Sequence, residues 1–144
     1  MSETDPHDLQ RFVTAQEPVF ATALAELRAG RKRTHWMWFV FPQLRGLGRS
    51  PTATYYGILS LDEARAYLAH PLLGPRLELC TDAVSGIEGR TLHEIFGSPD
   101  DLKLRSSATL FALVSAPESV FARLLAKYFD GGDEQTLRLL GRPA

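Results

Sequence analysis

Residues 31–50 read RKRTHWMWFVFPQLRGLGRS and contain both tryptophans of the chain, Trp36 and Trp38. Aromatic side chains bury large areas, so this segment is expected to organise the core. Thr34 can cap a short buried helix that runs to about Val40, with Pro42 ending it. A strand is the alternative, because aromatic and branched residues favour strands. The two indoles cannot face the same way on a short helix, so we expect at least one to leave the core.

The segment before it predicts a helix or a broken pair of helices over residues 5–29. Apolar residues follow helical spacing on both sides of Pro18, which restarts the pattern. Gly30 then follows as the expected left-handed residue at the end of the helix.

The segments after residue 50 also read as helices. Ser60 and Glu63 form a capping box that opens a helix to about Ala69, and Thr91 caps a short helix. Ser98, Pro99 and two aspartates predict the start of a central buried helix that runs to about Ser115. The other expected helices cover residues 53–58, 73–86 and 117–128 and a segment around 137–140.

The pattern as a whole predicts an all-α protein. No alternation of the strand type, internal repeat or low-complexity linker interrupts residues 1–144. A chain of 144 residues with 44% hydrophobic composition is expected to fold as one domain, 1–144, with its own core. We therefore predict a compact domain of about seven or eight helices, several of them short.

Composition also limits where the protein can work. There is no apolar run of membrane-spanning length, and the first ten residues lack the basic and apolar parts of a secretion signal. The one cysteine, Cys80, has no internal disulfide partner and falls on an apolar helical stripe, so it is interpreted as an inert core thiol. These features predict a cytoplasmic protein without a membrane partner.

Charge is distributed unevenly. The net charge is −1, but residues 27–61 contain no acidic residue and six cations, so that segment carries +6 and the remainder −7. A local positive field attracts anions, although a solvated basic loop is an equally acceptable reading. Nucleic acid is not an expected partner, because the overall charge is slightly negative and no expected helix has a basic recognition stripe.

Several motifs resemble one bacterial family. The run His35-Trp36-Met37-Trp38-Phe39-Val40-Phe41-Pro42-Gln43, together with Lys103-Leu104-Arg105-Ser106-Ser107, is similar to the signature of a family of unknown function typified by a small mycobacterial hypothetical protein. Tyr56-Gly57-Ile58, Leu61-Asp62-Glu63-Ala64 and His70-Pro71 extend the resemblance over essentially the whole chain. The resemblance implies a mainly α-helical fold and no assigned biochemical role.

The candidate catalytic residue is His35. Burial and positive neighbours would lower its pKa and make it a general acid or base, whereas a core histidine bonded to a carbonyl is the alternative. No pair of the four histidines and Cys80 has metal-ligand spacing, so no metal site is predicted. The sequence indicates no cofactor.

The candidate ligand-binding residues lie in two basic segments. An exposed tryptophan beside arginines suits stacking on a ring, and guanidinium groups in a glycine-rich loop suit phosphate. Lys103 and Ser107 are one helical turn apart and can meet one ligand oxygen. The set is Trp36, Trp38, Gln43, Arg45, Arg49, Lys103, Arg105 and Ser107.

Two function hypotheses follow. In the first, the protein binds, and can hydrolyse, an anionic small molecule that is phosphorylated or nucleotide-like, at the basic aromatic segment. In the second, the protein is a non-catalytic interaction module whose basic loop docks an acidic protein. The sequence does not decide between them.

Overall fold

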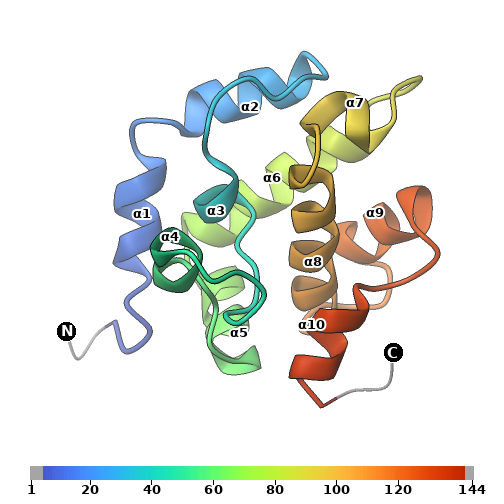
Figure 1. The fold of residues 1–144 in the computed structure, drawn as a ribbon. Helices are drawn as coiled ribbons and strands as arrows, with labels where there is room; N and C mark the ends of the chain where they lie inside the picture. Colours follow the sequence, from blue (N-terminus) through green and yellow to red (C-terminus); the bar gives the residue numbers. More distant parts are fainter. Residues whose placement is uncertain (1–4, 142–144) are drawn as a thin grey trace.

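The computed structural model describes residues 5–141, and within that range the regular elements are helices (Figure 1). Ten helices follow one another: α1 (Gln10–Gln16), α2 (Phe20–Arg28), α3 (Met37–Val40), α4 (Pro51–Tyr55), α5 (Leu61–Ala69), α6 (Leu73–Ser85), α7 (Leu92–Phe96), α8 (Asp100–Ala112), α9 (Val120–Tyr128) and α10 (Glu134–Leu139). This confirms the all-α prediction. The described chain has more helices than the expected seven or eight, and several are short, as predicted: α3, α4 and α7 have four or five residues each.

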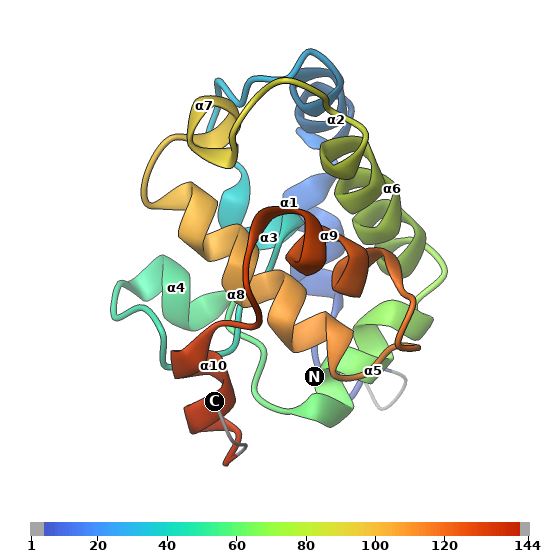
Figure 2. The same ribbon diagram turned by 90° about the vertical axis from the view of Figure 1, so that its right-hand side faces the viewer.

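The two longest helices in the described chain are α6 and α8, and α9 packs against both of them. Figures 1 and 2 show α2 and α7 at one end of the molecule and α5 and α10 at the other. One hydrophobic core connects the helices from Leu9 to Leu124. As predicted, α8 is the central buried helix, with its residues 106–111 all buried. No helix within residues 5–141 is long and apolar enough to cross a membrane.

Helix ends follow the predictions where a capping side chain is available. Ser60 and Thr91 accept the expected backbone N–H groups, and Gly30 has a φ of 79° after α2. Helix α4 begins two residues earlier than predicted, because Ser50 caps it and Pro51 occupies its first position. Ser98 is not a cap: Pro99 holds the N-cap position of α8, with no side-chain hydrogen bond.

The segment between α2 and α3 is held by a buried carboxylate. Glu26 accepts hydrogen bonds from the backbone N–H groups of Arg33 and Thr34, from the Thr34 hydroxyl and from the Trp36 indole, at 2.6–3.0 Å. Thr34 therefore binds Glu26 instead of capping α3, whose N-cap is Trp36. The predicted short helix is present. Trp36 is buried and Trp38 is partly buried. This agrees with the expectation that at least one of the two indoles leaves the core.

Candidate functional site

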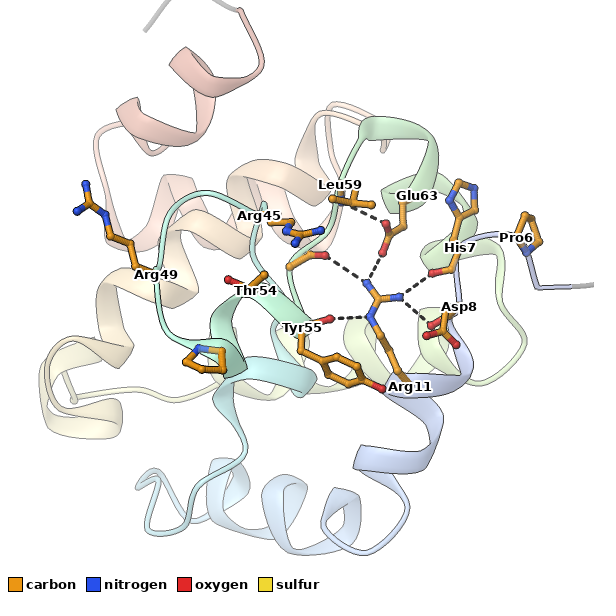
Figure 3. A pocket seen from close by; sticks show the side chains of 12 residues that line it. Pro6, His7, Asp8, Arg11, Arg45, Arg49, Thr54, Tyr55, Leu59 and Glu63 are labelled. Carbon is orange, nitrogen blue, oxygen red and sulfur yellow. Dashed lines mark hydrogen bonds and ion pairs between the residues drawn. The ribbon is translucent and has the colours of Figure 1, made fainter. Parts of the chain in front are cut away.

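A cavity of about 700 Å³ opens between the start of α1, α4 and the loop before α4 (Figure 3). We call it the arginine pocket, because three arginines line it. Its apolar wall includes Tyr55 and Leu59, which are 56% and 63% exposed. The lining residues are Pro6, His7, Asp8, Arg11, Arg45, Arg49, Pro51, Thr54, Tyr55, Gly57, Leu59 and Glu63.

Arg11 forms the base of this pocket and is fully occupied. Its Nε donates to the Tyr55 carbonyl, Nη1 to the carbonyls of His7 and Asp8, and Nη2 to the Gly57 carbonyl and to Glu63. The ion pair with Glu63 is 2.7 Å long, with side-chain exposures of 7% and 1%. A guanidinium has five N–H donors, so none is left for a ligand. Arg11 is thus a structural group that ties α1, α4 and α5 together.

In the described part of the chain, Arg45 and Arg49 differ from Arg11 in having no side-chain partner. Both are exposed, and neither makes a hydrogen bond or ion pair through its side chain within residues 5–141. In Figure 3, Arg45 is drawn near Leu59 and Glu63. Arg49 is at the left of the view, and His7 is at the right. Within residues 5–141, the pocket therefore has a neutralised base, two unpaired cations and one exposed carboxylate, Asp8. The excess of cations favours an anionic group.

The backbone of Arg45 is fixed by a short bridge to the segment after α4. Its N–H donates to the Ile58 carbonyl at 2.8 Å, and the Ile58 N–H donates to the Gln43 carbonyl at 2.9 Å, as part of an isolated parallel bridge between Leu44 and Ile58. Gly57 makes this approach possible, since a Cβ there would lie 2.8 Å from the Arg45 Cα. The position of Arg45 at the pocket thus depends on a glycine from another segment.

Replacing Gly57 with alanine is expected to destabilise the protein by about 1–3 kcal/mol, because the added methyl group must push the Arg45 backbone away. Chemical denaturation of the purified variant measures this loss. Gly131→Ala is the matched control, since a Cβ there meets nothing within 4 Å. Equal stability of the two variants would show that the close approach at Gly57 is not a constraint.

A second, smaller cavity of about 340 Å³ lies between the loop before α4, the start of α8 and the start of α10. We call it the Trp38 pocket. Lys103 places its Nζ 4.1 Å from the centre of the Trp38 ring and 3.0 Å from Asp100. Burial alone would raise the pKa of Asp100, but Lys32 and Lys103 lower it. The lining residues are Trp38, Gln43, Leu47, Gly48, Pro99, Leu102, Lys103, Ser106, Asp133 and Gln135.

The predicted site residues therefore divide between two places. Arg45 and Arg49 lie at the arginine pocket, whereas Trp38, Gln43 and Lys103 line the Trp38 pocket. The sequence reasoning placed all five at one site. Gln43 and Arg45 lie on either side of Leu44, which forms the bridge to Ile58, and they line different cavities.

The remaining predicted residues are placed less favourably. His35 is exposed, so neither the buried acid or base nor the core histidine describes it. Trp36 is 1% exposed and Ser107 is also 1% exposed, which leaves neither open to a ligand. Arg105 donates twice to the Gly131 carbonyl and lies over the Phe129 ring, so it holds the turn before α10.

Sequence reasoning missed most of the arginine pocket. It left out His7 and Tyr55, and it gave Glu63 only a helix-capping role. Glu63 accepts from the Leu59 N–H as well as from Arg11, which lies 52 positions away in sequence. No local signal marks such a pairing, because Arg11 alone reads as an ordinary solvated residue of an amphipathic helix.

Other chemistry has little support in the described part of the chain. No three His, Cys, Asp or Glu side chains among residues 5–141 come together in a metal-binding arrangement. Cys80 is buried, as predicted, and burial raises the pKa of its thiol to about 12. A thiol of that kind is a poor nucleophile at neutral pH.

Fold and cavities together define a class: a mainly helical protein with a basic pocket on its surface. The chain belongs to the family described as "Protein of unknown function (DUF1810)", which matches residues 6–140. It is similar to the crystal structure of the conserved hypothetical protein Rv1873 from Mycobacterium tuberculosis, at 61% identity and a TM-score of 0.93, over 96% of this chain and 100% of that one. No curated protein matches the chain. The resemblance found from the sequence motifs is confirmed.

Proposed function

We propose that the protein binds a small anionic molecule, of the phosphorylated or nucleotide-like kind, in the arginine pocket. The observation that carries this proposal is the pair Arg45 and Arg49, two guanidinium groups that have no partner among residues 5–141 and lie at the rim of a cavity of about 700 Å³. That volume lies in the usual range of small-molecule sites. Arginine suits phosphate because its planar fork donates two parallel hydrogen bonds.

The same pocket offers a surface for the uncharged part of such a ligand. Tyr55 and Leu59 are exposed large apolar side chains, and both line this cavity. Burying them under a ring or a sugar removes apolar area from water, which favours binding. His35 does not line the pocket, so the proposal is one of binding, with no catalytic role assigned to that residue.

The test is isothermal titration calorimetry with inorganic phosphate, pyrophosphate and adenosine 5′-monophosphate at low ionic strength. The double variant Arg45→Gln/Arg49→Gln is expected to weaken binding of at least one probe about tenfold or more, because hydrogen bonds to charged groups contribute about 1.5–3 kcal/mol each. Adding salt should weaken binding to the wild type as well, since both arginines are exposed.

Arg31→Gln/Arg33→Gln is the matched control. It removes two exposed arginines from the same basic segment without touching the pocket. A change of less than about twofold is expected there. Equal weakening by both double variants would mean that the whole basic segment acts as a diffuse field, which favours docking of an acidic protein. Failure of all three probes to bind the wild type would refute the proposal.

A further inference from the structure

The Trp38 pocket contains a polar side chain that the fold itself does not use. Gln43 is 9% exposed, yet its amide makes no hydrogen bond with any residue in the described chain. The Gln43 amide atoms still have some solvent-accessible surface. Within residues 5–141, the side-chain atom that is both fully enclosed and without a hydrogen-bond partner is the Ser85 hydroxyl. The small accessible surface of Gln43 therefore opens into the pocket that it lines.

Gln16, the other buried glutamine, shows what a structural amide looks like in this protein. Its Nε2 donates to the Phe39 carbonyl at 2.7 Å and to the Tyr67 hydroxyl at 3.0 Å, and its Oε1 accepts from Arg76 at 3.4 Å. Buried amides in proteins are nearly always satisfied in this way, because an unpaired one is unfavourable. Gln43 is the exception among these two buried glutamines, because its side-chain amide has no hydrogen-bond partner among residues 5–141 and lines a cavity.

Among the residues that line the Trp38 pocket, the charged side chains are Lys103 and Asp133. Lys103 is paired with Asp100 at 3.0 Å. Asp133 caps α10 by accepting the Thr136 N–H and hydroxyl through one oxygen, Oδ2. The pocket thus has no unpaired cation of the kind that marks the arginine pocket. An anionic ligand would find no unpaired cation to neutralise it there, whereas an uncharged polar ligand gives up no hydrated charge on entry.

The remaining polar atoms are suited to an amide-like edge. Gln43 offers a donor and an acceptor side by side. The Ser106 hydroxyl donates to the Leu102 carbonyl at 3.2 Å, and its oxygen keeps lone pairs that can accept a hydrogen bond. Asp133 keeps its second carboxylate oxygen as an acceptor. Leu47, Leu102 and Trp38 supply apolar walls. A glutamine amide can pair in two places with a group that carries an adjacent donor and acceptor, such as the edge of adenine.

We infer that the Trp38 pocket binds an uncharged planar group with an adjacent amide-type donor and acceptor, held by paired hydrogen bonds to Gln43. A nucleobase edge and a free carboxamide share this chemistry. The site is separate from the arginine pocket and does not depend on the function proposed for it. A volume of about 340 Å³ accommodates one such ring.

The experiment is a titration of ¹⁵N-labelled full-length protein with adenosine, uridine and nicotinamide, followed by two-dimensional NMR. Trp38 and the Gln43 side-chain amide report on the pocket, and the Trp36 indole, which is buried and bonded to Glu26, is the internal control. Saturable shifts of Trp38 and Gln43 are expected with at least one probe. Binding of nicotinamide identifies the carboxamide as sufficient, and binding of the nucleosides alone identifies the nucleobase.

Two variants decide whether Gln43 is responsible. Gln43→Leu is expected to weaken the probe's binding at least about tenfold and to keep the melting temperature within about 2 °C of wild type. Gln16→Leu, the matched control, is expected to lower the melting temperature by about 5 °C or more, because it leaves buried partners unsatisfied. Gln43→Glu keeps the shape and removes the donor, and it should also weaken binding.

The inference is overturned if no probe shifts Trp38 and Gln43, or if the shifts persist unchanged in Gln43→Leu. A large loss of stability in Gln43→Leu would likewise overturn it, since the side chain would then have a structural role. Arg45→Gln/Arg49→Gln should leave these shifts intact. Failure of this site is therefore distinguishable from failure of the arginine pocket to bind phosphate.

Discussion

Replacing Arg11 with methionine is expected to destabilise the protein by about 3–5 kcal/mol, which is the usual loss when one partner of a buried ion pair is removed. Glu63 would be left charged at 1% side-chain exposure. Four backbone carbonyls would lose a donor at the same time, those of His7, Asp8, Tyr55 and Gly57. Urea denaturation of the variant and the wild type measures the difference.

Arg65→Met is the matched control for this prediction. This substitution also breaks an arginine–carboxylate pair. Arg65 pairs with Asp62, three positions earlier on the same helix, and both side chains are exposed, at 57% and 82%. Exposed pairs contribute about 0.5 kcal/mol or less, so little change is expected. If Arg11→Met and Arg65→Met lost the same stability, the Arg11–Glu63 pair would not be a buried one in solution.

The double variant Arg11→Met/Glu63→Met separates the ion pair from the carbonyl contacts. Removing both charges is expected to restore part of the stability lost in Arg11→Met, because no unpaired carboxylate remains. The carbonyls at Tyr55 and Gly57 would still lack a donor. Since these carbonyls border the arginine pocket, anion binding by the double variant is expected to remain weaker than in the wild type.

Sequence alone predicted the elements whose signals are local. Gly30, the Ser60 cap and the Thr91 cap depend on residues within one turn of each other, and all three were right. The capping box predicted at Ser60 is only half formed, because the Glu63 side chain accepts from the Leu59 N–H and Arg11, whereas Thr91 and Glu94 form a complete box. The buried centre of α8 followed from its apolar composition. Thr34 failed as a cap because the carboxylate of Glu26, on the preceding helix, binds its hydroxyl and N–H. A local preference was overridden there by a contact between elements.

The candidate site was only partly predictable for the same reason. The charge asymmetry of the sequence indicated Arg45 and Arg49, and both line a cavity without a side-chain partner among the described residues. Arg105, from the second basic segment, was also predicted to bind a ligand but is used by the Gly131 carbonyl, a partner 26 positions away. Which cation is free depends on distant acceptors, and a single sequence does not reveal these. The same holds for the two glutamines, which look alike until their partners are known.

Lowering the pH is expected to remove about 3 kcal/mol of stability through Glu26 alone. Burial by itself would raise the pKa of Glu26, but hydrogen bonds from Thr34, the Arg33 N–H and the Trp36 indole outweigh it and lower the pKa from 4.5 to about 2. A carboxyl group whose pKa is lower in the folded state stabilises the fold above its unfolded value. That contribution is present above pH 4.5 and is lost as the pH falls towards 2.

Glu26→Gln isolates this contribution, because glutamine keeps an oxygen for the backbone N–H groups but does not titrate between these pH values. The difference in unfolding free energy between wild type and Glu26→Gln, measured by urea denaturation at several pH values, should shrink by about 3 kcal/mol as the pH falls through this range. Other acidic groups titrate in both proteins and cancel. A difference that stays constant with pH would mean that Glu26 is not held as a carboxylate by these four hydrogen bonds.

The consequence of losing Glu26 extends beyond stability, because the same carboxylate fixes the segment that leads to Trp38 and the Trp38 pocket. Its bonds to Thr34 and Trp36 set the start of α3, and Trp38 follows two residues later. Glu26→Ala is therefore expected to shift the Trp38 indole resonance while the protein is still folded at neutral pH, and to weaken any ligand of the Trp38 pocket. The arginine pocket, which is tied to Arg11 rather than Glu26, should keep its anion affinity in that variant.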